Sequence, residues 1–162
     1  MTAPLPRVAT AADIPELVRI INAAYRVEDF FIDGDRTSAH ELAAMMSRPF
    51  GAFLVVDTAE GDTLAAGVYI ELRGRSMYFG MLSVDPALQR SGHARRLIDA
   101  IDARAREAGC AALEIEVVNL REELPAFYRR LGFVVTGERP FHSGEKLKRP
   151  AHMVLMERTL QP

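Results

Sequence analysis

The sequence predicts an α/β (α+β) fold, in which a mixed, mostly antiparallel sheet contains a central parallel strand–helix–strand unit and carries helices on both faces. Three apolar runs separated by short polar turns predict an antiparallel meander. An amphipathic helical pattern then stands between two strand-like segments, and a crossover helix of this kind makes the two strands parallel. Further helical patterns lie before the meander and after the parallel unit.

The N-terminal part of the chain predicts a short strand and two helices. The strand is expected at residues 6–10. Asp13 with Glu16 three residues later forms a capping-box pattern, which places the start of a helix here. Ser38 and Glu41 repeat the pattern and predict a second helix. The loop between the two helices mixes aromatic and charged side chains.

The meander follows these helices. Three strands are expected at residues 52–56, 63–72 and 76–84. Turns containing Gly61 and Gly74 join them, and such short connections favour antiparallel neighbours.

The helix after the third strand has the most regular pattern in the chain. Its apolar residues recur at i, i+3, i+4, i+7, i+11 and i+14 and form one stripe: Ala94, Leu97, Ile98, Ile101, Ala105 and Ala108. Gly109 suits the left-handed position that closes a helix. Residues 113–118 then form the second strand of the parallel unit.

The remaining chain predicts one more helix and two strands. Gly132 ends the helix, whose apolar face contains Leu124, Phe127, Tyr128 and Leu131. The strands are expected at residues 133–141 and 151–159, with a polar, basic loop between them.

Composition limits the class of protein. A chain of 162 residues is expected to form one domain, residues 1–162. A formal net charge of −2 gives no reason to expect nucleic acid or an anionic membrane as a partner. Cys110 is the single cysteine, which excludes an intrachain disulfide and suits a reducing compartment. With no membrane-spanning apolar run and no signal-peptide core, we expect a cytoplasmic protein.

The loop before the central helix carries the clearest functional signal. It reads Gln89-Arg90-Ser91-Gly92-His93-Ala94, and its backbone N–H groups open the helix at the positive end of the dipole, where phosphate binds. Gly92 would let the backbone approach a ligand closely. The segment V-D-P-x-x-Q-x-x-G-x-A, beginning at Val84, resembles the acyl-CoA-binding motif of the GNAT superfamily of N-acetyltransferases. The alternative is that this segment is an ordinary strand–helix turn without a ligand. The sequence patterns of a P-loop and of a dinucleotide-binding loop are both missing.

A second segment supports the same resemblance. Residues 126–133 resemble the Y-x-x-x-G-F segment of the family, in which the tyrosine commonly acts as general acid toward the coenzyme thiolate. The resemblance therefore implies this role for Tyr128. A phenol of reference pKa about 10 can protonate a thiolate of pKa about 8.5. The alternative is that Tyr128 packs on an apolar helix face beside Leu124.

The resemblance implies an activity and a site. The activity is direct transfer of an acyl group, expected to be the acetyl group of acetyl-CoA, to a primary amine of a small molecule or peptide, and a homodimer is a common state in the family. Residues implied to hold coenzyme A are Leu82, Ser83, Val84, Gln89, Arg90, Ser91, Gly92, His93, Ala94 and Arg121. The residues expected to wall the acceptor pocket are Phe30, Phe31 and Arg36, although the two phenylalanines could instead cover the core.

The sequence departs from the family pattern at two places. Arg121 stands where many relatives carry an asparagine, so it could contact a coenzyme phosphate, an acidic acceptor or solvent. The strand at residues 76–84 lacks the glutamate that some relatives place there as a base. Glu71 and Glu116 on neighbouring strands are candidates, but solvated surface roles are favoured for both, and a water chain could serve instead.

No metal is expected, because the four histidines show no metal-ligand spacing. The missing base leaves one alternative of a different class, a non-catalytic coenzyme A-binding sensor or regulatory module.

Overall fold

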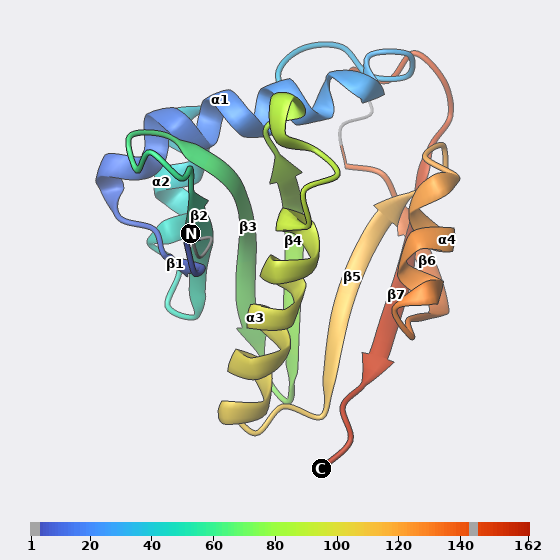
Figure 1. The fold of residues 1–162 in the computed structure, drawn as a ribbon. Helices are drawn as coiled ribbons and strands as arrows, with labels where there is room; N and C mark the ends of the chain where they lie inside the picture. The colour runs from blue at the N-terminus through green and yellow to red at the C-terminus, as the bar shows by residue number, and fades with distance from the viewer. Residues whose placement is uncertain (1–3, 143–145) are drawn as a thin grey trace.

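The computed structural model describes residues 4–142 and 146–162, and its sheet confirms the predicted fold (Figure 1). The described strands form one seven-stranded sheet in the order β1-β2-β3-β4-β5-β7-β6. β4 and β5 are parallel, and the other neighbouring pairs are antiparallel. The strands are β1 (Arg7–Val8), β2 (Gly51–Asp57), β3 (Leu64–Arg73), β4 (Ser76–Val84), β5 (Ala112–Val118), β6 (Val134–Pro140) and β7 (His152–Thr159).

The helices cover both faces of the sheet, as predicted. They are α1 (Ile14–Ala24), α2 (Ala39–Met46), α3 (His93–Glu107) and α4 (Glu123–Arg130), with a short 3-10 helix, η2 (Tyr25–Glu28), after α1. Alternate residues of β2 point to opposite faces of the sheet. Leu54 and Val56 join the core under α3 and α4, whereas Phe53 and Val55 join the core under α1 and α2.

One predicted helix cap is wrong. The capping box lies at Thr10 and Asp13, where the Thr10 N–H donates to the Asp13 carboxylate at 2.8 Å, and it begins a 3-10 turn before α1. Asp13 makes no side-chain cap for α1, and Glu16 instead accepts the Leu64 N–H at 3.2 Å. At α2 the Ser38 hydroxyl accepts the Glu41 N–H at 3.2 Å, as predicted.

The meander contains an irregularity that the sequence pattern did not predict. β3 and β4 pair in register as far as Tyr69 and Gly80, and the register then shifts before Gly67 meets Ser83. Two residues of β4, Met81 and Leu82, therefore stand opposite one residue of β3, which is a β-bulge. Met81 takes a left-handed φ of 54°, an uncommon conformation for a residue with a side chain.

The parallel strands separate soon after they meet. β4 and β5 pair only through Ser76, Met77 and Tyr78, opposite Ala112 to Glu114. Figure 1 shows the two strands diverging above this point, with α3 crossing from one to the other. The β5-facing edge of β4 beyond Tyr78 therefore has no strand partner among the described residues, which leaves its backbone groups available to a ligand.

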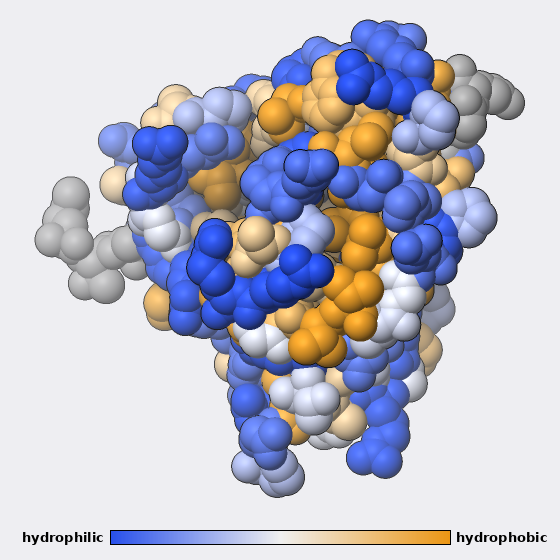
Figure 2. Space-filling model, turned by 90° about the vertical axis from the view of Figure 1, so that its right-hand side faces the viewer, coloured by the Kyte–Doolittle hydropathy of each residue, from blue (hydrophilic) through white to orange (hydrophobic). Residues whose placement is uncertain are grey.

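The edge strand β6 begins with two exposed apolar residues. β6 ends the strand order, and Val134 and Val135 are exposed on it. Figure 2 shows apolar side chains gathered on the face that includes this strand. No helix of the described residues is long and apolar enough to cross a bilayer.

Candidate active site

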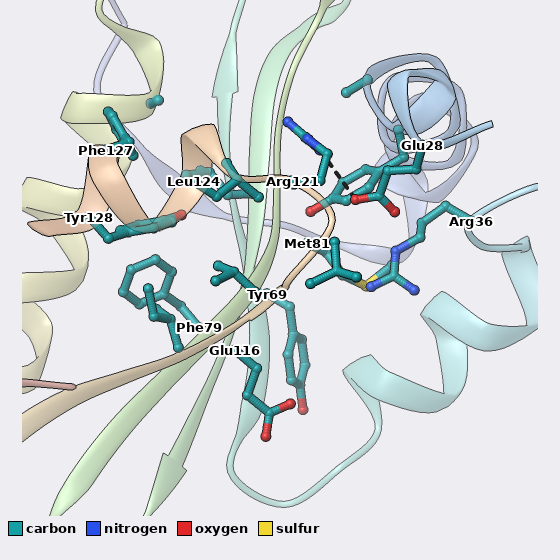
Figure 3. Close-up of a pocket in the computed structure, with 18 of the residues that line it drawn as sticks. Glu28, Arg36, Tyr69, Phe79, Met81, Glu116, Arg121, Leu124, Phe127 and Tyr128 are labelled. Carbon is teal, nitrogen blue, oxygen red and sulfur yellow. Dashed lines mark hydrogen bonds and ion pairs between the residues drawn. The ribbon is translucent and has the colours of Figure 1, made fainter. Parts of the chain in front are cut away.

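A cavity of about 1360 Å³ opens where β4 and β5 diverge (Figure 3). The loop before α3 and the first turn of that helix line one end of it. The end of α1, η2 and α2 line the other end, and α4 forms a side wall. The elements that the sequence singled out therefore share one cavity.

The predicted phosphate loop is placed at the cavity, in a conformation that exposes backbone N–H groups. Arg90 and Gly92 both have left-handed φ angles, of 68° and 81°, and Gly92 is the N-cap of α3. Gln89, Arg90, Gly92, His93 and Ala94 line the cavity, whereas Ser91 is exposed outside it. A Cβ at Gly92 would meet no heavy atom within 4 Å, so in this structure the glycine is required by its φ angle rather than by space.

The bulged end of β4 forms the floor between the two ends. Leu82 and Val84 line the cavity, while Ser83 is 2% exposed and directed away from it. The Ser83 hydroxyl donates to the Met81 carbonyl at 3.0 Å, which ties the two ends of the bulge together. This hydrogen bond stabilises the bulged conformation.

Tyr128 lies on α4 with its ring in the core and one side on the cavity. It packs against Phe79, Phe127 and Phe133, with ring centroids 6.1, 5.0 and 5.5 Å away. Burial raises the pKa of the Tyr128 phenol well above its ordinary value near 10. Figure 3 shows its hydroxyl directed toward Leu124, one turn earlier on the same helix. The phenol stays protonated at neutral pH and has no side-chain hydrogen-bond partner among the described residues.

The predicted acceptor residues do not all reach the cavity. Arg36 lines it, but Phe30 and Phe31 do not. Phe31 is fully buried and makes edge contacts with Phe30 and Phe141, at centroid distances of 5.0 and 6.3 Å. Phe31 is therefore an interior side chain, whereas Phe30 is 43% exposed, and contact of either with an acceptor stays a prediction.

Arg121 bridges two elements that face each other across the cavity. Its guanidinium lies 3.2 Å from the Glu28 carboxylate on η2 and also pairs with Glu123. The Arg121 side chain is only 17% exposed, so a purely solvated position is excluded. Its predicted contact with coenzyme A stays a prediction.

Glu28 is the site residue that the sequence analysis missed. It is 7% exposed and lines the cavity. Burial raises the pKa of its carboxyl, and the charges of Arg36 and Arg121 partly oppose that rise. The sequence could not show that Glu28 is buried, because a charged residue at the end of an amphipathic helix is usually exposed. Its burial depends on α4 and on the loop around Arg36.

The two carboxylates considered as bases are held in ion pairs. Hydrogen bonds from Tyr69, Arg73 and Arg48 lower the pKa of Glu71. The Arg139 guanidinium lowers the pKa of Glu116. Both groups are weak proton acceptors at neutral pH. The sequence favoured solvated surface roles for them, but each side chain is only 18% exposed and is paired with arginine. Within the described residues, no group of three or more His, Cys, Asp or Glu side chains could hold a metal ion.

Comparison with known proteins gives a family for this arrangement. The family model described as "Acetyltransferase (GNAT) domain" matches residues 23–147. Blasticidin-S acetyltransferase from Streptomyces morookaense is 29% identical over 97 residues, which cover 59% of this chain and 70% of that protein.

Solved structures share the fold at low sequence identity. Ard1 from Thermoplasma volcanium superposes with a TM-score of 0.80 at 19% identity, covering 99% of this chain and 100% of that one. The ribosomal-protein-S18-alanine N-acetyltransferase from Escherichia coli gives 0.78 at 18% identity, covering 97% and 94%. A nourseothricin acetyltransferase gives 0.75 at 18% identity, covering 99% and 100%.

Proposed function

Since the chain belongs to the GNAT acetyltransferase family, we propose that it transfers the acetyl group of acetyl-CoA directly to a primary amine, with Tyr128 as general acid. Residues 1–162 would act as one catalytic domain. The observation that carries the proposal is that a buried, protonated phenol and a helix N-terminus open into the same cavity. Acetyltransferases of this family use acetyl-CoA as co-substrate.

The residues at the α3 end of the cavity fit the pyrophosphate of coenzyme A. The helix is 15 residues long, so its dipole is well developed at the Gly92 end. The left-handed Arg90 and Gly92 turn the loop so that successive N–H groups can converge on an anion. Arg90, Arg95 and Arg130 line the cavity and supply positive charge for phosphate oxygens. The N–H groups of the loop, rather than one side chain, would make the main contact.

The bulged strand and α4 would perform the transfer. The substrate thioester supplies an activated acetyl group when bound. Backbone N–H groups between Met81 and Val84 would stabilise charge on the acetyl oxygen, since β5 leaves this edge of β4 unpaired. The amine nitrogen forms its bond to the acetyl carbon as the carbon–sulfur bond breaks, and Tyr128 gives its proton to the departing sulfur. The acceptor ammonium releases two protons in all: one replaces the proton of Tyr128 and the other reaches solvent.

Ligand-dependent stability tests the coenzyme site. Acetyl-CoA at a hundred times its Kd should raise the free energy of unfolding by about 2.7 kcal/mol. Gly92→Asp should abolish the accompanying thermal shift, because it places a carboxylate beside the phosphates. Gly74→Asp is a matched control, since Gly74 also has a left-handed φ and open space but lies in the β3–β4 turn.

The proposed coenzyme site fails if acetyl-CoA stabilises neither the wild type nor Gly74→Asp, or if it still stabilises Gly92→Asp fully. Thiol release from acetyl-CoA with a panel of amines separates an enzyme from a coenzyme-binding sensor, because the sensor would show the thermal shift without turnover.

A further inference from the structure

Arg36 places a positive charge at the acceptor end of the cavity. It lies in the loop between η2 and α2, and its guanidinium carbon is 5.1 Å from the centre of the Tyr25 ring. The residues that the structure describes provide no carboxylate within ion-pair distance of it. The other cavity arginines nearby, Arg121 and Arg139, are held by glutamates. Arg36 is therefore the guanidinium that can accept an anionic group from a ligand.

Glu28 provides the opposite charge beside it. One of its carboxylate oxygens accepts from Arg121, which leaves the other oxygen available. Figure 3 shows the Glu28 carboxylate and the Arg36 guanidinium projecting toward the same space beside Met81. Met81 belongs to the bulge where the acetyl group is proposed to lie. An amine bound to Glu28 would thus stand next to the reacting carbon.

The charge balance of this end disfavours polycations. Arg36, Arg48 and Arg73 line this side of the cavity together with Glu28 and Glu41. Glu71 pairs with both Arg48 and Arg73, so this side carries no excess of negative charge. A polyamine would place its second ammonium group near these arginines or near Arg36, where like charges repel. A molecule with one ammonium and one carboxylate would satisfy both Glu28 and Arg36.

We propose that the acceptor is a zwitterionic amino acid, whose carboxylate binds Arg36 and whose amine is held by Glu28. The inference rests on the proposed acetyltransferase function and names its substrate class. The ammonium gives its first proton to the Glu28 carboxylate, and the freed lone pair then attacks the acetyl carbon. Arg121 is a positioning residue, since it holds Glu28 without reaching the acceptor.

The test compares acceptors with and without the carboxylate. Thiol release from acetyl-CoA is measured with the twenty protein amino acids, with the amides of those that react, and with spermidine and a lysine-containing peptide. We expect at least one free amino acid to react with a kcat/KM about 10- to 100-fold above that of its amide, the usual range for a charge-assisted hydrogen bond.

Arg36→Gln tests whether Arg36 is the group that binds the carboxylate of the acceptor. It should lower kcat/KM for the free amino acid by about the same 10- to 100-fold, yet leave the amide within about twofold and the KM for acetyl-CoA unchanged. Arg26→Gln is the matched control, because Arg26 is a nearby exposed arginine that pairs with Asp29 and Asp35 and does not line this cavity.

Several results would overturn the inference. One is an equal kcat/KM for the amino acid and its amide, and another is an equal effect of Arg36→Gln on both. A preference for spermidine or the peptide, or no reaction with any amino acid, would also contradict it. If the enzyme prefers an acceptor without a carboxylate, this inference is wrong but the proposed function is supported. Absence of both turnover and coenzyme-dependent stabilisation would instead count against the proposed function.

Discussion

At the scale of single residues, the surroundings of each buried group determine whether it is suited to give a proton or to take one. Tyr128 is enclosed by aromatic rings, so the ionised phenolate is disfavoured and the acid form persists. Glu28 is buried beside two arginines, so its carboxyl is harder to ionise than a surface glutamate but retains a charged partner. Opposite pairs of acid and base with displaced pKa values are typical of catalytic sites.

Replacing Tyr128 by Phe tests the acid. The change removes the hydroxyl and keeps the ring, so the aromatic contacts should survive. General acid catalysis contributes about 10²- to 10⁴-fold, so kcat should fall by that order, while the Kd for acetyl-CoA and the Tm stay nearly unchanged. Because burial raises the pKa of Tyr128, the alkaline fall of wild-type activity should lie above pH 10 and should be missing from the residual rate of the variant. A variant that keeps more than about half of kcat, with chemistry rate-limiting, would make Tyr128 a packing residue.

The sequence pointed to Tyr128 and the loop before α3 because both stand in short motifs that resemble those of the GNAT family, and their roles stay predictions. It missed Glu28 because nothing local distinguishes a buried glutamate from an exposed one. The same limit applies to Phe31, whose full burial depends on Phe141, more than a hundred residues later. Residues within one short motif could therefore be predicted from the sequence. Burial of a side chain by segments far along the chain could be seen only in the structure.

At the scale of elements, the site lies where β4 separates from β5, and the bulge in β4 lines it. A regular strand would continue its register past Gly80, whereas here Met81 and Leu82 stand opposite one residue of β3 and both line the cavity. The bounds of β4 agree with the predicted strand at residues 76–84. The bulge itself could not be predicted, because a left-handed residue is usually glycine and here it is Met81.

Ser83→Ala tests whether catalysis depends on the hydrogen bond that holds the bulge. The variant loses the hydrogen bond from the Ser83 hydroxyl to the Met81 carbonyl, worth about 1 kcal/mol of unfolding free energy. It should lower kcat more than it weakens acetyl-CoA binding, because the loop before α3 is untouched. Ser76→Ala, at the regular start of the same strand, is the control and should leave kcat within about twofold. Equal, small effects of both variants on kcat would mean that the bulge needs no such tie.

At the scale of the whole molecule, the sheet consists of two parts joined at one end. β1 to β4 form one part and β5, β7 and β6 form the other, and only a short stretch of β4 and β5 pairs them. The alternation of strands and helices predicted the order of elements along the chain and the parallel pair, but not that β7 lies between β5 and β6 in the sheet. It did not predict the ion pair of Glu28 and Arg121, which connects the end of α1 to the β5–α4 segment across the open side.

The last prediction concerns this connection and its dependence on pH. Because burial raises the pKa of Glu28 above its usual 4.5, proton binding favours the folded state at low pH. That contribution is lost as pH rises through the raised pKa. Arg121→Met removes a charge that opposes the rise, so the pKa should climb further and the loss at neutral pH should grow. Urea unfolding should show a destabilisation of about 1–3 kcal/mol at pH 7.5 and a smaller one at pH 5.

A second substitution shows whether Arg121→Met destabilises the fold by leaving the Glu28 charge uncompensated or by removing packing contacts. Glu28→Gln combined with Arg121→Met leaves no buried carboxylate, so the double variant should recover most of the stability at pH 7.5 and lose the pH dependence. Glu28→Gln alone should be mild, because Arg121 keeps its pair with Glu123. If Arg121→Met costs the same at both pH values, or the double variant is no more stable than the single one, Arg121 stabilises the open side by packing alone. If the prediction holds, the ion pair that joins the two parts of the sheet also keeps Glu28 ionised at the acceptor end of the cavity.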